Sequence, residues 1–185
     1  KSLYEKLQKG ISYNYNNFNQ DFYIKNINLP FLNGSSEIIS INSEKDLYLS
    51  YSKDMFIKPS DDQKCFVADT LPAGQTLRVF AENRDIPFNV IKNQKILINS
   101  LIDIKGEYRF VCIKDYIAGC SKYLDRGKYD ISGIVPEKVI QCAREYIKIN
   151  QPSDIYTMDL CELADGSIKI VEYNCWNCSG LYNIN

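Results

Sequence analysis

Three oxygen-bearing side chains near the C-terminus, Asp159, Glu172 and Asn174, have the types and spacing of a cation site. They lie in two segments of alternating apolar and polar residues, and Asp165-Gly166 between these segments predicts a two-residue β-hairpin turn. With that turn, Asp159 lies opposite Glu172, and Asn174 points to the same face. Facing carboxylates repel unless a cation or proton lies between them, and carboxylate and amide oxygens suit Mg²⁺ better than zinc. The hairpin therefore predicts a magnesium site.

The residues alone also allow a second interpretation of this hairpin. In it, the carboxylates lie on the solvated outer face of an antiparallel sheet. An odd-numbered turn would also change the register on which the argument depends. The opposite face is largely apolar and is expected to pack on a helix; it consists of Tyr156, Met158, Leu160, Lys169, Val171 and Tyr173.

Basic side chains occur at strand positions upstream of the hairpin. Lys58 ends a short apolar run, Lys64 follows six residues later, and Arg109 lies inside the apolar segment 107–113. An arginine in an apolar strand must pair with an acid or face a ligand, so an ion pair with Glu107 or between strands remains open. Simple solvation remains open for Lys64. Together with a Mg²⁺ site, however, two lysines and an arginine are the groups that bind a triphosphate.

The sequence contains no histidine, which excludes Ser-His-Asp and Cys-His triads and histidine-ligated zinc. The C-x-x-C segment from Cys175 to Cys178 could be a redox dithiol or half of a zinc site. No second C-x-x-C exists, and Cys161 would bring the ligands only to three, so reduced thiols beside the metal hairpin are favoured. Seven cysteines, an odd number, without a recognisable secretion signal also indicate a cytoplasmic protein.

Composition excludes several classes of protein. The 185 residues are 45% hydrophobic and 24% charged, as in globular proteins, and the formal net charge is −1. We therefore expect no dedicated nucleic-acid surface, and no apolar run approaches the roughly 20 residues of a membrane span. The sequence begins at Lys1 and not at methionine, which is consistent with the loss of an upstream segment. Nothing in the sequence indicates an oligomeric state.

The elements that would position these side chains form an α+β pattern. The clearest helix is expected over residues 136–149, where Pro136 suits the first turn and apolar residues fall on one face. Strands or extended segments are expected at 37–41, 55–58, 65–68, 95–99, 107–113, 116–120, 154–163 and 168–174. The expected divisions are a reduced or partial N-terminal region (1–45), an N-terminal lobe (46–100) and a C-terminal lobe with the metal hairpin (101–185).

These residues resemble an ATP-grasp domain, and specifically the divergent clade marked by one arginine and two lysines. The resemblance rests on FIKPSDDQKCFV at 56–67, EYRFVCIKDYIAGCSKY at 107–123 and YTMDLCELADGSIKIVEYNCWNCSGLY at 156–182. The last piece is the most specific, because an Asp strand, a turn, an E-x-N strand and a trailing SGLY occur together. The resemblance implies two small α+β lobes with mostly antiparallel sheets and a nucleotide cleft between them.

The resemblance also implies roles for the basic residues. Lys58 is similar to the strand lysine that contacts ATP phosphates, and Lys64 is similar to the second lysine of the clade. Arg109 resembles the arginine that steadies the transferred phosphate or an acyl phosphate. These are the three residues for which the clade is named.

The resemblance also implies positions for the metal and for the adenine of the nucleotide. Asp159, Glu172 and Asn174 resemble the Mg²⁺ ligands of the family, in agreement with the hairpin register. The hinge against which adenine packs would include Ser100 and Leu101. ATP and Mg²⁺ are thus the implied cofactors.

The implied function is Mg-ATP-dependent ligation, in which a small-molecule or peptide carboxylate forms an acyl phosphate that an amine (or a thiol) attacks. A non-catalytic nucleotide- or peptide-binding module is the alternative, and a small cysteine-rich metal protein is a third. Two departures from the family leave the substrates and catalytic completeness open. Residues 1–45 are too short for a full N-terminal substrate domain, and the loop between Lys58 and Lys64 contains no glycine.

Overall fold

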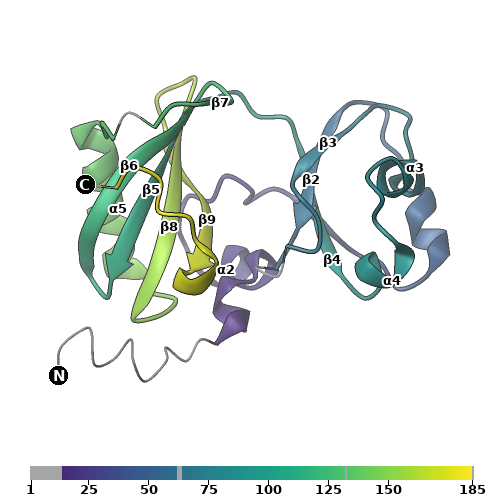
Figure 1. The fold of residues 1–185 in the computed structure, drawn as a ribbon, viewed down its shortest axis with the longest axis horizontal. Helices are drawn as coiled ribbons and strands as arrows, with labels where there is room; N and C mark the ends of the chain where they lie inside the picture. The colour runs from purple at the N-terminus through teal and green to yellow at the C-terminus, as the bar shows by residue number, and fades with distance from the viewer. Residues whose placement is uncertain (1–13, 62–63, 132, 185) are drawn as a thin grey trace.

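A computed structural model describes residues 14–61, 64–131 and 133–184, which form two lobes, each built on an antiparallel sheet (Figure 1). The N-terminal lobe has the strand order β1-β4-β2-β3, and the C-terminal lobe has the order β7-β6-β5-β8-β9. The strands are β1 (Glu37–Ser40), β2 (Met55–Pro59), β3 (Asp69–Leu71), β4 (Lys95–Ser100), β5 (Ile104–Ile113), β6 (Tyr116–Asp125), β7 (Lys128–Tyr129), β8 (Ile155–Leu163) and β9 (Ile168–Cys175). The helices are η1 (Tyr15–Phe18), α2 (Gln20–Asn26), η2 (Glu44–Tyr48), α3 (Leu77–Glu82), α4 (Phe88–Ile91), α5 (Glu137–Ile149) and η3 (Trp176–Cys178). The expected α+β fold of two small lobes with mostly antiparallel sheets is confirmed.

The core of the N-terminal lobe lies between its sheet and the short helices α3 and α4 (Figure 1). Side chains alternate across β2, so Ile57 is fully buried in this core while Lys58 points to the opposite face of the sheet. The side chain of Thr76 caps the N-terminus of α3 by accepting a hydrogen bond of 3.3 Å from the backbone N–H of Val79. This core therefore fixes Lys58 on the face that looks toward the other lobe.

The C-terminal lobe packs α5 against one face of its five-stranded sheet (Figure 1). Val139, Ala143 and Ile147 recur every four residues along α5 and are all buried, which is the pattern of a helix with one apolar face. On β9, Tyr173 points into this core, so its neighbours Glu172 and Asn174 point away from the helix. The sheet therefore presents its polar side chains to the cleft.

The β8–β9 hairpin does not have the expected two-residue turn. The N–H of Leu163 donates to the carbonyl of Ser167 at 3.0 Å, which closes a three-residue loop with Gly166 at a φ of 83°. This loop shifts the register by one residue, and a β-bulge between Asp159 and Leu160 shifts it back. Asp159 consequently still pairs with Glu172, as expected, although the turn that led to this expectation is wrong.

The bulge also changes which β9 residues face the core. Leu160 pairs with Ile170, and both Ile168 and Ile170 are buried in the core of the C-terminal lobe. The expectation that Lys169 and Val171 share the core face with Tyr173 is therefore wrong. Val171 instead lines the cleft beside Glu172.

Residues 14–34, here called the interlobe segment, carry η1 and α2 and lie between the two lobes (Figure 1). Tyr23 packs against Tyr173 in the core of the C-terminal lobe, with ring centroids 5.2 Å apart. On its other side, the backbone N–H of Gln20 donates to the carbonyl of Ser60 at 2.7 Å, and Asp21 forms an ion pair with Lys95 of β4. The interlobe segment therefore contacts both lobes.

Two further sequence expectations concern the connections. The extended segment expected at 65–68 is wrong as a strand, because the strand that pairs with β2 is β3, three residues long and beginning at Asp69. The chain passes from the first sheet to the second between Ser100 and Ile104. The domain limits at residues 45 and 100 remain predictions. No helix in the described part of the chain is long and apolar enough to cross a membrane.

Candidate functional site

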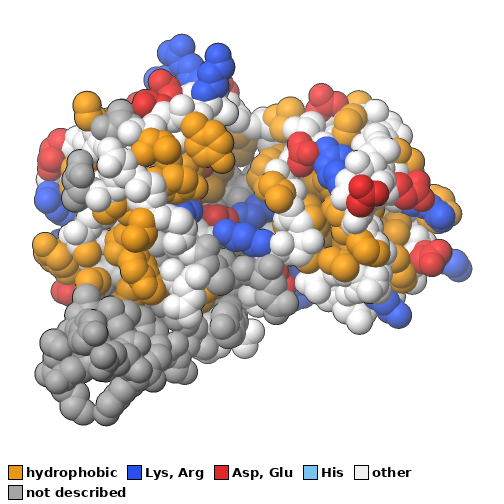
Figure 2. Space-filling model, in the orientation of Figure 1, with side chains coloured by type: hydrophobic (Ala, Val, Ile, Leu, Met, Phe, Trp, Pro, Cys, Tyr) orange, Lys and Arg blue, Asp and Glu red, His pale blue; other side chains and the backbone are white. Residues whose placement is uncertain are grey.

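A cavity of about 290 Å³ lies between the lobes, near the lower end of the size range of small-molecule pockets. Lys58 lines it from the N-terminal lobe, Glu107 and Glu172 line it from the C-terminal lobe, and Ser100 and Leu101 line it at the connection between the lobes. Figure 2 shows this hollow with basic and acidic side chains at its floor. The predicted hinge residues thus border the same cavity as Lys58 and Glu172, one predicted phosphate residue and one predicted metal residue.

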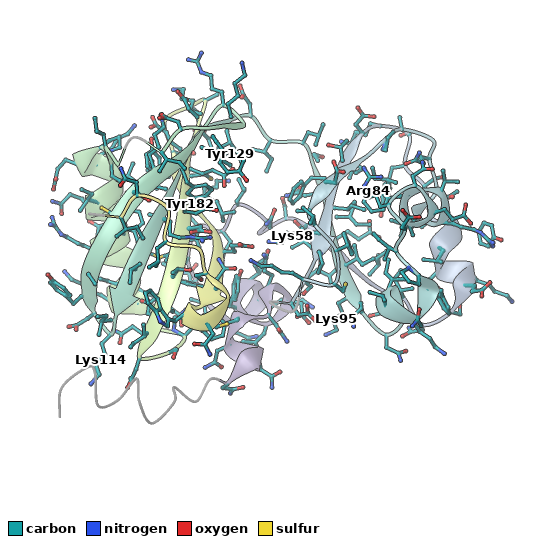
Figure 3. All side chains as sticks on the ribbon, viewed as in Figure 1. Lys58, Arg84, Lys95, Lys114, Tyr129 and Tyr182 are labelled. Carbon is teal, nitrogen blue, oxygen red and sulfur yellow. The ribbon has the colours of Figure 1, made fainter. Side chains whose placement is uncertain are left out.

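Glu172 is held by two lysines of the N-terminal lobe. The Lys58 ammonium forms an ion pair with Oε2 of Glu172, and the Lys64 ammonium lies 3.7 Å from Oε1. Burial alone would raise the pKa of Glu172, but Lys58 and Lys64 outweigh it and hold the pKa well below its usual range. Figure 3 shows Lys58 pointing into the space between the lobes. Glu172 is therefore a carboxylate that remains charged in a partly buried position.

Asp159 is almost fully buried and is paired with Arg109 across strands β5 and β8. Arg109 donates from Nε to Oδ1 at 2.8 Å and from Nη2 to Oδ2 at 2.6 Å, which is a bidentate arrangement. Burial raises the pKa of Asp159, and the Arg109 guanidinium opposes that rise. The Nδ2 of Asn174 also donates to Oδ2 of Asp159, at 3.3 Å. Asn174 in turn accepts a 2.8 Å hydrogen bond from Lys64 on its Oδ1.

The Arg109 guanidinium has further contacts with the C-terminal segment. Its Nη1 donates to the carbonyl of Gly180 at 2.8 Å, and its Cζ lies 5.0 Å from the ring centroid of Tyr182. The Tyr182 ring stacks on Tyr123 with centroids 4.9 Å apart and planes 7° from parallel. An arginine has five N–H donors, and its hydrogen bonds to the described residues use three of them, so two remain for a ligand.

The structure brings six of the predicted site residues together from both lobes; they are Lys58, Lys64, Arg109, Asp159, Glu172 and Asn174. The expectation that the facing carboxylates repel unless a cation or proton lies between them overlooked the basic side chains. Arg109 neutralises Asp159, and the two lysines neutralise Glu172. The inter-strand ion pair that the sequence left open for Arg109 is present. The roles of these residues toward a nucleotide remain predictions.

The donor set at the carboxylates fits a hard cation. Asp159, Glu172 and Asn174 offer only oxygen donors on one face of the hairpin, as Mg²⁺ prefers. Among the residues that the structure describes, no three acidic, cysteine or histidine side chains converge, so the candidate set is two carboxylates and one amide. An ion that takes so few protein ligands keeps waters or phosphate oxygens in its other positions, which is typical of Mg²⁺.

Several residues in the cleft were not among the predicted site residues; Glu107 was considered only as an ion-pair partner of Arg109. Tyr123 donates a hydrogen bond of 2.5 Å from its hydroxyl to Glu107, and burial raises the pKa of Glu107. Glu107 shares a strand face with Arg109, and this spacing could have identified it. Nothing in the sequence pattern indicated Gln20, whose Nε2 lies 3.5 Å from Glu172 although the two are 152 residues apart.

The cysteines of the C-x-x-C segment give no sign of a metal centre. Cys175 is buried at the end of β9, and no cluster of three metal-ligating side chains occurs among the described residues. The side chain of Cys178 lies outside the described residues. A redox or zinc role for this pair thus gains no support from the described part of the chain.

Comparison with known proteins gives a family and a fold. The matching family model describes ATP-grasp domains, family 2 of the clade named for one arginine and two lysines, and it covers residues 39–185. No curated protein matches the sequence significantly.

Similar solved structures include D-cycloserine synthetase DcsG, which is 13% identical, with 91% of this chain and 64% of that chain covered at a TM-score of 0.52. D-alanyl-alanine synthetase A from Vibrio cholerae is 12% identical, with 91% and 58% covered at a TM-score of 0.53. D-alanine–D-alanine ligase from Bacillus anthracis, solved with ATP, is 9% identical, with 86% and 55% covered at a TM-score of 0.56. At such identities the likeness shows the fold alone. The chain spans less than two thirds of each of these proteins.

Proposed function

This chain belongs to the ATP-grasp domains, in family 2 of the clade with one arginine and two lysines, and from this membership we propose that it is a Mg-ATP-dependent ligase that joins a carboxylate to an amine. One observation carries the proposal. Three basic side chains, Lys58, Lys64 and Arg109, converge from both lobes on the carboxylates Asp159 and Glu172. Lys58 and Glu172 also line the cavity between the lobes. A triphosphate needs basic side chains for its phosphate oxygens, and its divalent cation needs carboxylates close to them.

The lysines would bind phosphate oxygens. Both ammonium groups now neutralise Glu172, and Lys64 is the more accessible of the two, with 46% of its side chain exposed against 11% for Lys58. Asp159, Glu172 and Asn174 would hold Mg²⁺, which when bound would neutralise charge on the phosphates. With a cation bound at Glu172, both lysines would be free to bind the phosphate oxygens, because the cation would balance the charge of Glu172. Glu172 would thus be paired with the lysines in the absence of nucleotide and with Mg²⁺ in its presence.

Arg109 would steady the group that is transferred. The terminal phosphoryl group passes from ATP to a substrate carboxylate oxygen, and ADP leaves. The amine then attacks the carbonyl carbon of the acyl phosphate, the C–O bond to phosphate breaks, and the amine loses a proton. Arg109 has two N–H donors beyond its hydrogen bonds to the described residues, enough to bind one phosphate edge. Catalysis by this chain would thus consist of positioning and charge neutralisation.

The substrates are proposed only as classes, namely a small-molecule or peptide carboxylate and an amine. The similar structures named above are synthetases and ligases of D-cycloserine and D-alanyl-alanine, which supports amino acids and short peptides as the first candidates. The chain spans only part of these enzymes, so a non-catalytic nucleotide-binding module remains the second candidate. Turnover separates the two.

The test has two parts. Millimolar ATP with Mg²⁺ should raise the melting temperature of the chain. A ligand at about 100 times its dissociation constant adds roughly 2.7 kcal/mol to the free energy of unfolding. A panel of amino acids and short peptides is then screened for stimulated ADP release. Absence of any Mg-ATP shift in a folded sample contradicts the proposal, and a shift without stimulated ADP release favours the binding module.

A further inference from the structure

Three amide side chains form a continuous hydrogen-bonded chain from the end of β4 to Glu172. The backbone N–H of Ser100 donates to Oδ1 of Asn99 at 2.8 Å, and Nδ2 of Asn99 donates to Oδ1 of Asn33 at 3.4 Å. Nδ2 of Asn33 donates to Oε1 of Gln20 at 3.1 Å, and Nε2 of Gln20 donates to Oε2 of Glu172 at 3.5 Å. The amides are 2–8% exposed, so this is a buried polar network. Such a network is costly unless every member is satisfied.

The direction of this amide chain is fixed at both ends. A backbone N–H, as at Ser100, can only donate, and an ionised carboxylate, as at Glu172, can only accept. Each amide between them must therefore accept with its oxygen on one side and donate with its nitrogen on the other. Gln20 has its oxygen satisfied by Asn33, which leaves its NH₂ group to face Glu172. The donor at Glu172 is thus determined by the network and not by a free rotation of the Gln20 amide.

Gln20 is also held in place through its backbone and its neighbours in α2. Its N–H donates to the carbonyl of Ser60, and the next residue, Asp21, accepts from the Ser60 hydroxyl at 3.1 Å. Three residues later, Tyr23 packs on Tyr173, the neighbour of Glu172 on β9. Both lobes therefore define the position of Gln20. Gln20 and Asn33 precede residue 39, where the family match begins.

An uncharged donor at Glu172 has a use that a lysine cannot supply. Oε2 of Glu172 accepts from both Lys58 and Gln20. If Lys58 moves to a phosphate, Gln20 is the donor that stays, and it does not compete with a cation for the negative charge. A hydrogen bond to a ligating carboxylate fixes the orientation of that carboxylate and commonly affects metal affinity strongly.

We propose that Gln20 is a positioning residue for Glu172 as a cation ligand, and that Asn33 and Asn99 hold the Gln20 amide in the donating direction. The proposal rests on the proposed function. It makes the interlobe segment a part of the nucleotide site rather than a cover on the C-terminal core. A merely structural role for Gln20 would change the stability of the protein but not its requirement for Mg²⁺.

The test compares Gln20→Met, which keeps the length of the side chain and removes the amide, with the wild type. The readout is the Mg²⁺ concentration that gives half of the ATP-induced rise in melting temperature, at a fixed ATP concentration. We expect this concentration to rise about tenfold or more, the usual effect of removing such a partner. Asn26→Met is the matched control, because Asn26 is exposed on the same helix and its amide donates to the backbone carbonyl of Phe22, away from the cleft. An unchanged Mg²⁺ requirement in Gln20→Met overturns the proposal.

A second variant tests the network and covers the case in which Gln20→Met does not fold. Asn33→Leu removes the group that orients Gln20 and should also raise the Mg²⁺ requirement. If Asn33 acts through Gln20, the double variant should require no more Mg²⁺ than Gln20→Met alone. Asn33 also lines the cavity, so its substitution can change ATP binding directly. Each variant is therefore also measured with ATP in the absence of Mg²⁺, which separates that effect from a change in the Mg²⁺ requirement. Additive effects of the two changes on the Mg²⁺ requirement overturn the network.

The wild-type measurement separates failure of the proposed function from failure of the role proposed for Gln20. If the wild type shows no Mg-ATP response, the proposed function fails, and the role of Gln20 fails with it. If the wild type responds and Gln20→Met has the same Mg²⁺ requirement, only the role of Gln20 fails.

Discussion

Arg109 and Asp159 are cross-strand partners joined by two hydrogen bonds, of 2.8 Å from Nε to Oδ1 and 2.6 Å from Nη2 to Oδ2. The residue that the family resemblance assigns to phosphate therefore holds a carboxylate that the same resemblance assigns to Mg²⁺. Both side chains are less than about 10% exposed, so removing either partner would leave a buried charge without its counter-charge. A variant at Arg109 must then affect stability and nucleotide binding together.

Arg109→Lys keeps the positive charge but loses the planar fork. We expect the free energy of unfolding to fall by about 1.5–3 kcal/mol, the scale of a hydrogen bond to a charged group. The variant should also respond less to Mg-ATP, because lysine cannot bind a phosphate edge and Asp159 at two points. Thermal melts with and without Mg-ATP on one sample measure both effects. Wild-type stability with lost ATP binding would show that the ion pair contributes little to the fold.

Lys58→Met should destabilise the protein in a pH-dependent way. Because Lys58 and Lys64 lower the pKa of Glu172 in the folded state, their stabilising effect is present above the unfolded pKa of about 4.3 and is lost as pH falls through the folded pKa. Removing one partner of a buried pair should cost about 3 kcal/mol at pH 7, the low end for such changes because Lys64 remains. The difference between wild type and variant should narrow from about pH 5 to about pH 2 in urea unfolding. A constant difference over that range would contradict this assignment of charge.

Glu172→Gln leaves Lys58 buried without its counter-charge. Repulsion between facing carboxylates, taken alone, predicts unchanged or higher stability in the absence of ligand, but the two lysines reverse this expectation. We expect a loss of about 1–3 kcal/mol and a much smaller melting shift with Mg-ATP.

The matched control for this variant is Glu162→Gln on the neighbouring strand. Glu162 pairs at 2.7 Å with Lys138, an exposed lysine on α5, so the change should be close to neutral and should leave the Mg-ATP shift intact. Lys169 is a poor control, because the β-bulge removes it from the core face where the simple register places it. Equal ligand-induced shifts in the Glu172 and Glu162 variants would contradict the metal assignment.

The hairpin shows how far alternation along a strand can be used. The pairing of Asp159 with Glu172 followed from counting out from Asp165-Gly166, yet the loop has three residues and a bulge at Val171 corrects the count. Local turn preferences did not reveal the bulge, since it depends on packing Ile170 into the core formed by residues distant in sequence. The faces of residues 172–174, beyond the bulge, were predicted correctly. The faces of residues 168–171, between the loop and the bulge, were not.

The contacts between the lobes could not be predicted from the sequence, for a different reason. Gln20 meets Glu172 across 152 residues, and no periodicity links a polar, asparagine-rich segment to a distant strand. The short helices α3 and α4 were missed because six and four residues hold too little of a helical repeat. The strands β8 and β9 and the 13-residue helix α5 were predicted to within one residue at each end, because each carries several repeats of its pattern. Only the first half of β6 was predicted.

Lys64 offers a way to separate nucleotide binding from stability. It adopts a positive φ of 51°, which is unfavourable for a residue with a side chain and common at functional sites. Its side chain is about half exposed, so its ion pair with Glu172 at 3.7 Å contributes little to the fold. In Lys64→Gly, the backbone strain of about 1 kcal/mol is relieved, because glycine adopts positive φ without a steric cost. We therefore expect equal or slightly higher stability without ligand.

The same variant should bind Mg-ATP more weakly, because one of the two lysines that face the phosphates is gone. Lys64→Ala is the control for the backbone, since it removes the ammonium but keeps the strained φ; it should lose the same affinity and melt lower than Lys64→Gly. Calorimetric titration with Mg-ATP and thermal melts of both variants measure the two effects separately. If Lys64 is only a solvated loop lysine, both variants should bind Mg-ATP like the wild type, and the positive φ would then reflect the path of the loop rather than a functional constraint.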